Sequence, residues 1–262
     1  MQKYGQHFLV NKGIISKITQ AVVDNAQGEI VEIGPGKGAL TNALLENGIN
    51  NFTAVEIDKE MSDYLKQNLP SYAQVNIIEG NFLTVPTSAL PQGDKTFVSN
   101  LPYIDAADIL LKVLDTEGFK AAVFMFQREQ AQRLSAKEEN KQYGPLSVIF
   151  QAFAQASSVC RVSPGSFNPP PKVDSEVLLI TPKDGGLFKD AAHKNNFKVL
   201  VKAVFAYRRK TVLNALSETY RKHKDNIIPV LAKSGIKVSA RAEELNYRKY
   251  ADLAANLEGI IF

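Results

Sequence analysis

Cysteine, histidine and long apolar runs are scarce in this chain of 262 residues, and each scarcity excludes a class of protein. The single cysteine, Cys160, excludes an internal disulfide and fits a reducing compartment. Three scattered histidines give no His/Cys cluster, so we expect no metal site. The N-terminus does not resemble a signal peptide, and even the uncharged run of residues 145–160 is broken by Gln and Ser. We therefore expect a cytoplasmic protein that does not enter a membrane.

Acidic residues are scarce only in the last third of the chain. Residues 186–262 contain 15 Lys and Arg against 7 Asp and Glu, whereas residues 1–185 contain 16 against 20. The length allows one domain of ordinary size with an appendage, and we place the boundary between residues 184 and 185. A basic appendage suits a polyanion such as nucleic acid, although a well-solvated helical surface explains the charge equally well.

The segment Asn100-Leu101-Pro102-Tyr103 combines two hydrogen-bond acceptors with an aromatic ring. It follows residues 94–99, whose apolar pattern predicts a buried strand, and open α/β sheets bind ligands beyond the carboxyl ends of their strands. Pro102 biases Leu101 towards an extended conformation, so the Leu101 carbonyl and the Asn100 side-chain oxygen both stay available. Two acceptors beside a flat ring suit a planar base with an exocyclic amine. The alternative is a plain turn at the end of a strand.

Three earlier strands are predicted, and each ends in a residue suited to a nucleotide cofactor. Residues 29–33 lead into a glycine turn, Gly34 to Gly38, and a predicted helix, as in nucleotide-binding α/β folds. The spacing Gly-x-Gly-x-Gly departs from the dinucleotide fingerprint and disfavours NAD. Glu56 ends the next strand, where an acid commonly binds ribose, and Asn81 follows the third, where it contacts an adenine edge or only forms a turn. This order predicts an adenosine-containing cofactor beside Asn100.

Two further groups of residues are candidates for ligand binding. Phe167 precedes three prolines on a stiff loop, and is either a second wall for a stacked base or an anchoring side chain. Arg208, Arg209 and Lys210 lie between predicted helices of the basic region, and we favour phosphate binding for them over a solvated surface. Residues 4–9 are predicted to form a loose arm or a flap over the ligand.

Together these motifs resemble those of the ribosomal RNA adenine N6,N6-dimethyltransferases of the KsgA/Dim1 family. The segments that carry the resemblance are Gly5–Leu9, Val31–Gly38, Val55–Asp58, Asn100–Tyr103, Gln127–Glu129, Tyr143–Val148, Phe167–Ser175, Arg208–Lys210 and Arg241–Glu243. The resemblance implies a Rossmann-like α/β methyltransferase fold with a mostly parallel seven-stranded sheet. The catalytic domain would span residues 1–184, and a small all-helical rRNA-binding domain would span residues 185–262.

The resemblance also implies a methyl donor, a catalytic set and a target. S-adenosylmethionine, with S-adenosylhomocysteine as product and no metal, would be bound by residues His7, Leu9, Gly34, Glu56, Asn81 and Asn100. The catalytic set would comprise Asn100, Leu101, Pro102, Tyr103 and Phe167. The target would be two adjacent adenosines in the terminal hairpin of 16S rRNA in the small (30S) ribosomal subunit, each dimethylated during late assembly. We expect a monomer that needs no obligate protein partner.

Three positions depart from the family pattern. Family members often have Asn where His7 stands, Asp where Asn81 stands, and Asn-Ile-Ser/Thr where Ile104-Asp105-Ala106 stand. Loss of the charge at Asn81 predicts a weaker adenine contact, and the change after Tyr103 alters the rim of the active site.

Three other functions compete with this interpretation. Erm-type methyltransferases share the chemistry but act on 23S rRNA, and Leu101 and the proline run 169–171 favour the small-subunit enzymes over them. The second competitor is a ribosome-assembly or RNA-binding factor with little activity, against which the intact Asn100, Pro102 and Tyr103 argue. A DNA adenine methyltransferase would usually carry a larger recognition region.

Overall fold

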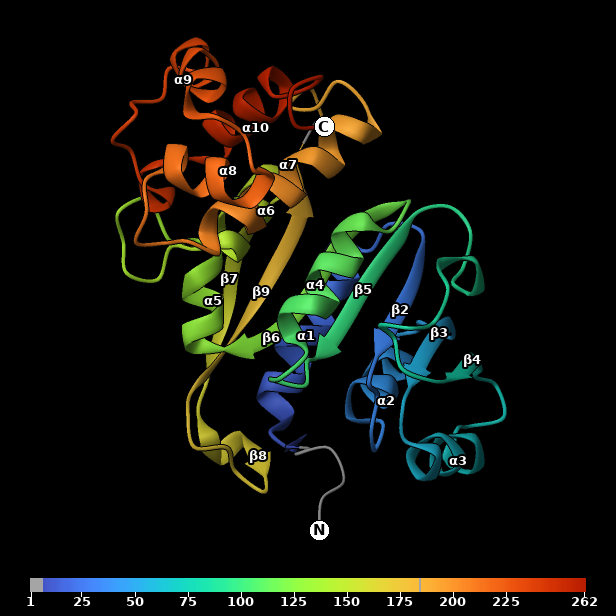
Figure 1. Ribbon diagram of the computed structural model, residues 1–262. Helices are drawn as coiled ribbons and strands as arrows, with labels where there is room; N and C mark the ends of the chain where they lie inside the picture. The colour runs from blue at the N-terminus through green and yellow to red at the C-terminus, as the bar shows by residue number, and fades with distance from the viewer. Residues whose placement is uncertain (1–6, 184) are drawn as a thin grey trace. The chain divides into compact units, whose positions relative to one another are not determined.

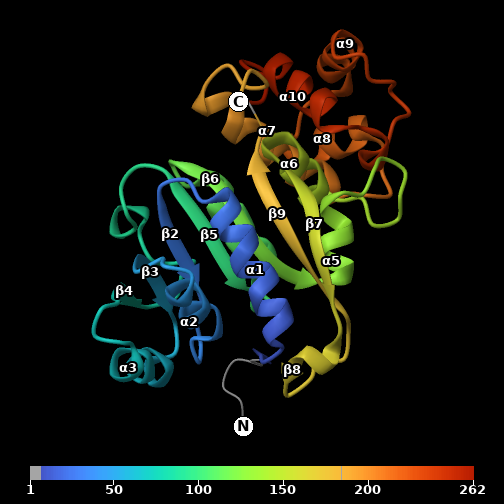
Figure 2. The same cartoon turned by 180° about the vertical axis from the view of Figure 1, so that it is seen from behind.

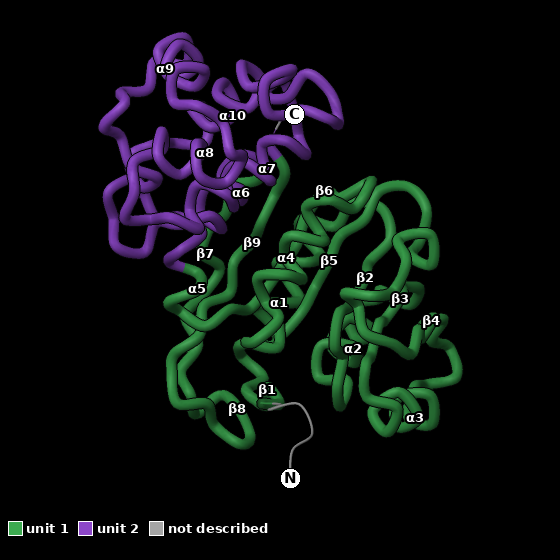
Figure 3. Tube along the Cα trace, in the orientation of Figure 1, with its two compact units in different colours: residues 1–131, 154–182 green, residues 132–153, 183–262 purple. Residues whose placement is uncertain are grey.

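The computed structural model describes residues 7–183 and 185–262, which fall into two compact units (Figure 3). Unit 1 spans residues 1–131 and 154–182, and unit 2 spans residues 132–153 and 183–262. The boundary that we placed after residue 184, which lies outside the described residues, is thus close to the last crossing between the units. Residues 132–153, which lie before the predicted boundary, group with the C-terminal unit.

Unit 1 is built on a seven-stranded sheet with the order β4-β3-β2-β5-β6-β9-β7 (Figure 1). Neighbouring strands from β4 to β6 are parallel, whereas β9 is antiparallel to both β6 and β7. The strands are β2 (Glu29–Ile33), β3 (Asn51–Glu56), β4 (Gln74–Glu79), β5 (Lys95–Asn100), β6 (Phe119–Gln127), β7 (Ala154–Val162) and β9 (Ser175–Pro182). The predicted Rossmann-like, mostly parallel seven-stranded sheet is confirmed.

Helices cover both faces of this sheet, which is why nearly every residue of its central strands β2, β5 and β6 is buried. Helix α1 packs against α2, β5, β6 and β7, and α4 packs against β6 from the opposite face (Figures 1 and 2). The apolar spacing that predicted α1 is its buried stripe, since Ile18 and Val22 are both fully buried. The helices that begin in unit 1 are α1 (Lys12–Asn25), α2 (Ala39–Glu46), α3 (Lys59–Asn68), α4 (Ala106–Asp115) and α5 (Arg128–Leu134).

A small two-stranded sheet fixes the N-terminal arm. Strand β1 (Phe8–Leu9) pairs antiparallel with β8 (Phe167–Asn168), so that Leu9 lies opposite Phe167. The Val10 N–H also donates to the Ser166 carbonyl at 2.9 Å. The arm is therefore held against the loop before β9 from residue 8 onward, although Gly5 and Gln6 of the predicted motif lie outside the described residues.

Unit 2 is all helical across its described residues. Its helices are α6 (Pro145–Phe153), α7 (Ala191–Phe205), α8 (Val212–Tyr220), α9 (Lys224–Lys233) and α10 (Tyr247–Asn256). Tyr143 explains why the segment before α6 belongs here: its hydroxyl donates to the Leu245 carbonyl at 2.9 Å, and its ring packs at the edge of Phe205. The expected C-terminal helical region is confirmed. None of the helices in residues 7–183 and 185–262 is long and apolar enough to span a membrane.

Candidate active site

The strand order places a crevice between β2 and β5. The chain runs outward from β2 through β3 to β4 and then returns to add β5 on the other side of β2. At such a switch point the loops leaving the two strands diverge, and ligands bind outside the carboxyl ends. The glycine turn after β2 and the segment after β5 therefore face one another. The buried Ser99 hydroxyl joins the strands by donating to the Ile33 carbonyl at 2.6 Å.

The glycine turn brings the backbone unusually close to its neighbours. Gly36 has φ +55°, and a Cβ there would lie 3.2 Å from the Phe8 ring. Gly38 has φ +79°, and a Cβ there would lie 2.8 Å from the Leu65 side chain. A larger residue at either position would be strained and would push against its neighbours, so glycine is required by both conformation and space.

Glu56 connects this turn to the end of β3. It is only 2% exposed, and its two carboxylate oxygens accept the Gly36 N–H at 2.9 Å and the Asp58 N–H at 2.8 Å. Burial raises the pKa of Glu56, and these two backbone N–H groups oppose that shift by stabilising the charge. Each oxygen retains a second lone pair, so the carboxylate can still accept ligand hydroxyls.

Glu32 is a second carboxyl group at the same crevice. It lies in the middle of the apolar strand β2, is 1% exposed, and accepts the Thr41 hydroxyl at 2.7 Å. Burial raises the pKa of Glu32 to about 7, with a smaller contribution in the same direction from the charge of Glu56. Glu32 has no cationic partner among the described residues. A buried carboxyl of this kind suits a cationic ligand, which would favour its ionised form.

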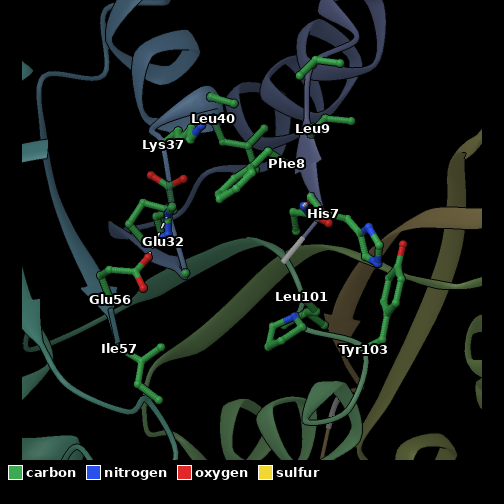
Figure 4. Close-up of a pocket in the computed structure, with 17 residues that line it drawn as sticks. His7, Phe8, Leu9, Glu32, Lys37, Leu40, Glu56, Ile57, Leu101 and Tyr103 are labelled. Atoms are coloured by element: carbon green, nitrogen blue, oxygen red, sulfur yellow. Dashed lines mark hydrogen bonds between the residues drawn. The ribbon is translucent and has the colours of Figure 1, made fainter. Parts of the chain in front are cut away.

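These groups line one cavity of about 210 Å³ in unit 1 (Figure 4). Glu56 and Ile57 lie on one side of it, His7 and Tyr103 lie on the other, and Leu101 lies between them. The remaining lining residues come from the arm, β2, the glycine turn, the start of α2, and the end of β5 with the residues after it: Phe8, Leu9, Val10, Glu32, Gly34, Pro35, Gly36, Lys37, Ala39, Leu40, Asn100 and Pro102.

The arm orients the amide of Asn100. Asn100 Nδ2 donates to the His7 carbonyl at 3.0 Å, and no described residue is hydrogen-bonded to Oδ1. The amide therefore presents a free acceptor beside Tyr103, whereas one of its two N–H groups is already engaged. Residues that are 93 positions apart cooperate in this arrangement, because the arm is fixed by the pairing of β1 with β8.

Tyr103 is held at both ends. Its hydroxyl is hydrogen-bonded to the Ser175 hydroxyl at 2.8 Å, and its carbonyl accepts the Gln130 side-chain amide at 2.8 Å. The His7 ring lies 5.9 Å from the Tyr103 ring at an angle of 29°, and His7 Nδ1 donates to the Pro169 carbonyl at 2.8 Å. Burial raises the pKa of Tyr103, so the ring remains a neutral, fixed platform.

Two predicted site residues lie outside this cavity. Asn81 forms a turn: its Oδ1 accepts the Leu83 N–H at 2.9 Å, and its carbonyl accepts the N–H groups of Thr84 and Val85. Phe167 is 4% exposed and packs in the hydrophobic core with Leu9. The structure thus favours the anchoring interpretation of Phe167 over a stacking wall, because pairing of β8 with β1 turns the ring into the core.

The three basic candidates lie on the surface of unit 2. Arg208 lies 3.9 Å from Glu243 and donates to the Lys141 carbonyl at 3.4 Å. Lys210 is paired with Glu218 and lies over the Tyr207 ring, whereas Arg209 is exposed. Their side chains are accessible to a polyanion, although two of them already have acidic neighbours.

Several residues that line the cavity were not predicted as site residues, and four of them are informative. Glu32 could have been found as the one acidic residue inside the apolar run Ile30 to Ile33. The Lys37 ammonium lies 4.9 Å from the centre of the Phe8 ring. No local sequence pattern predicts this contact. Ile57 follows Glu56 directly and is 41% exposed beside the cavity, which suits contact with a flat ligand surface.

The site fits an adenosine-containing sulfonium better than a phosphate-rich cofactor. Two buried carboxyls face a cavity that is otherwise mostly apolar, and such a lining would repel a pyrophosphate. No group of three or more His, Cys, Asp or Glu side chains that could hold a metal occurs in the described ranges 7–183 and 185–262. Fold and site together define an α/β protein of the methyltransferase class.

Comparison with known proteins narrows this class. Residues 1–258 match the family model described as ribosomal RNA adenine dimethylase, and the chain belongs to that family. The ribosomal RNA small subunit methyltransferase A of Geobacter sulfurreducens is 38% identical over 261 residues, 97% of this chain and 93% of that protein. The protein of the same name from Chlorobaculum tepidum is 40% identical over 84% of this chain and 78% of its own. The predicted family and enzyme class, an rRNA adenine dimethyltransferase, are confirmed.

Solved structures agree with this assignment. A dimethyladenosine transferase from Plasmodium falciparum superposes with a TM-score of 0.80 at 27% identity, covering 97% of this chain and 98% of its own. The 23S rRNA methyltransferase ErmE superposes with a TM-score of 0.69 at 21% identity, covering 96% and 99%. The second similarity shows the shared fold alone.

Proposed function

We propose that this protein transfers methyl groups from S-adenosylmethionine to N6 of two adjacent adenosines in the terminal hairpin of 16S rRNA in the small ribosomal subunit. Each product is an N6,N6-dimethyladenosine, formed by a monomer acting in the cytoplasm. The observation that carries the proposal is the orientation of the Asn100 amide: one N–H donates to the His7 carbonyl, and the side-chain oxygen is free beside Tyr103. The choice of small-subunit RNA rests on the names of the relatives that cover most of this chain.

The donor would lie along the cavity from β3 to β5. The ribose hydroxyls would bind the Glu56 carboxylate, the adenine would lie against Ile57, and the cationic end would face Glu32. Leu9, Gly34 and the His7 backbone would enclose it from the arm and the glycine turn. Asn81 would contribute only through its Nδ2 group, which its turn leaves unused and which can donate to an adenine nitrogen.

The target adenine would leave its stack to reach Tyr103. Its amine is a weak nucleophile because the lone pair is delocalised into the ring. By accepting the two N–H groups, Asn100 Oδ1 and the Leu101 carbonyl would favour a pyramidal nitrogen with its lone pair directed at the methyl carbon. The donor supplies a methyl on positively charged sulfur, and the sulfur keeps the S–C bonding pair as S-adenosylhomocysteine forms.

After transfer, the nitrogen carries one proton too many and releases it to solvent. The monomethylated amine then has a single N–H, so one of the two acceptors is unpaired during the second transfer. These roles require positioning and hydrogen bonding, and neither a covalent nucleophile nor a metal ion is needed for them. Pro102 would contribute by keeping the Leu101 carbonyl out of α4.

The helical unit 2 would bind rRNA phosphates through Arg208, Arg209 and Lys210. Replacing all three by Ala should lower the slope of log affinity against log salt by up to about 3, since each phosphate contact releases counterions. RNA binding measured by filter retention over a salt series tests this. Lys59→Ala in unit 1, where the lysine is paired with Asp63, is the control. An unchanged slope in the triple variant would assign these cations to a solvated surface.

The decisive experiment measures methyl transfer from radiolabelled S-adenosylmethionine to small ribosomal subunits that lack the two dimethyladenosines, with free 23S rRNA in parallel. Label in the small subunit, recovered as N6,N6-dimethyladenosine, is expected. Label in 23S rRNA would instead indicate an Erm-type enzyme. Binding to the small subunit without any label would indicate an assembly factor without activity.

A further inference from the structure

Ile104 is the most exposed large hydrophobic side chain of the described residues. It is 90% exposed, and the next in order is Tyr72 at 58%. Isolated apolar residues on a surface are common and need no explanation by themselves. Ile104 differs because it follows Tyr103 directly and so stands at the rim of the reaction cavity.

The backbone on both sides of Ile104 is fixed. The Asp105 N–H donates to the Pro102 carbonyl at 3.2 Å and closes a turn around residues 103 and 104. Ala106, the first residue of α4, is fully buried, and Tyr103 is held through its hydroxyl and its carbonyl. Ile104 is therefore an apolar side chain presented to solvent on a rigid support, and a floppy loop does not account for its exposure.

A target base that leaves an RNA stack leaves a gap beside its former neighbours. Proteins that open nucleic-acid stacks often insert an apolar side chain between bases, and isoleucine is one of the residues used. Such a wedge must be stiff, exposed and close to the base that moves. Ile104 meets all three conditions, since it adjoins the ring on which the extruded adenine would stack.

We propose that Ile104 is the wedge that enters the rRNA stack beside the extruded adenine and thereby favours the flipped state. This inference rests on the proposed function and extends it to a positioning residue that does not touch the reacting atoms. Its partner is the base flanking the target, which covers the isoleucine while the adenine is bound at Tyr103.

The test compares three variants on small ribosomal subunits. Ile104→Ser should lower kcat/KM for the subunit about tenfold without changing the Kd for S-adenosylmethionine, because the polar side chain no longer stabilises the opened stack. Ile104→Leu keeps an apolar side chain of the same volume and should stay within about twofold of the wild type. Tyr72→Ser is the matched control: it also removes an exposed apolar group, but before β4, at the opposite ends of the strands.

A second substrate separates a wedge from a merely structural residue. Subunits with a mismatch in the stem pair nearest the target loop hold the adenine less firmly, so flipping needs less help. The deficit of Ile104→Ser should shrink on these subunits. An equal deficit on both substrates, or no deficit on either, would overturn the wedge.

The same assay distinguishes the two proposals. If the wild-type protein transfers no methyl group to the small subunits, with or without the mismatch, the proposed function fails and the proposed role of Ile104 fails with it. If the wild-type protein methylates both kinds of small subunit and Ile104→Ser has the same kcat/KM, only the proposed role of Ile104 is wrong.

Discussion

Asn100 and Asn81 each stand at the end of a parallel strand of one sheet, yet their side chains do different things. The Asn100 amide donates to the His7 carbonyl and leaves its oxygen free at the cavity. The Asn81 oxygen instead accepts the N–H of Leu83, two residues further on, and the side chain does not line the cavity. A polar residue at a strand end therefore offers a free acceptor to the cavity only where the local turn does not use that acceptor.

The two asparagines are also held by different parts of the chain. Asn100 is oriented from a distance, by an arm that β8 holds in place. The turn at Asn81 is held by Lys112 of α4, whose ammonium donates to the carbonyls of Phe82, Leu83 and Val85. One asparagine presents its oxygen to the cavity, and the other belongs to a loop that Lys112 holds as a whole.

Among these variants, Asn100→Ala should lower the rate of methyl transfer the most. A smaller effect would contradict the difference drawn between Asn100 and Asn81. Loss of an acceptor that acts in the transition state should raise the barrier to methyl transfer by about 2–4 kcal/mol. Binding of S-adenosylmethionine should remain nearly intact. Single-turnover transfer and equilibrium dialysis measure the two quantities, and transfer at the wild-type rate would refute the role of the amide.

The raised pKa of Glu32 predicts that the stability of the protein depends on pH. Burial raises the pKa of Glu32 to about 7 from 4.5, so the folded state resists ionisation that the unfolded state accepts. Its contribution is neutral below about pH 4.5 and becomes unfavourable as pH rises to 7, by about 3 kcal/mol at most.

The free energy of unfolding of Glu32→Gln relative to wild type should therefore increase over that pH range and level off above it. Gln can still accept the Thr41 hydroxyl, so the packing is retained. Urea titrations at several pH values measure the difference. A difference that is independent of pH would show that Glu32 ionises normally.

Lys112→Met tests the support of the Asn81 turn. Methionine keeps the length of the side chain but leaves three carbonyls without their donor, which should cost about 1–3 kcal/mol of stability. If this loop borders the adenine, KM for S-adenosylmethionine should also rise several-fold while kcat changes little. Thermal unfolding and steady-state kinetics test both parts, and an unchanged KM would detach the loop from the donor site.

Asn81→Ala should have the smallest effect. It removes one hydrogen bond of a half-buried turn, worth about 0.5–1.5 kcal/mol, and should change methyl transfer far less than Asn100→Ala. Asn81→Asp keeps the turn acceptor and restores the charge often found in the family. A loss of transfer in Asn81→Ala as large as that of Asn100→Ala would abolish the distinction between the two strand ends.

Much of the secondary structure of unit 1 could be predicted from the sequence. The strands at residues 29–33, 75–79 and 94–99 and the helix at 39–46 were recognised within a residue or so, because apolar runs and glycine turns are local signals. Helix α6 was missed because its sequence is uncharged and apolar nearly all round, so it shows no polar face. The pairing of β1 with β8 was missed because two-residue strands leave no periodicity.

The sequence by itself determined which chemistry is available: two adjacent acceptors and a ring after β5, a glycine turn, an acid at the end of β3 and a basic helical region. Only the tertiary structure decided which of these groups face the cavity. The Asn100 oxygen is free at the cavity because the arm accepts an N–H of the same amide. Phe167 is buried because β8 pairs with β1. Glu32 faces the cavity from inside strand β2. Such choices depend on hydrogen bonds and packing between residues far apart in the chain, which local patterns do not encode.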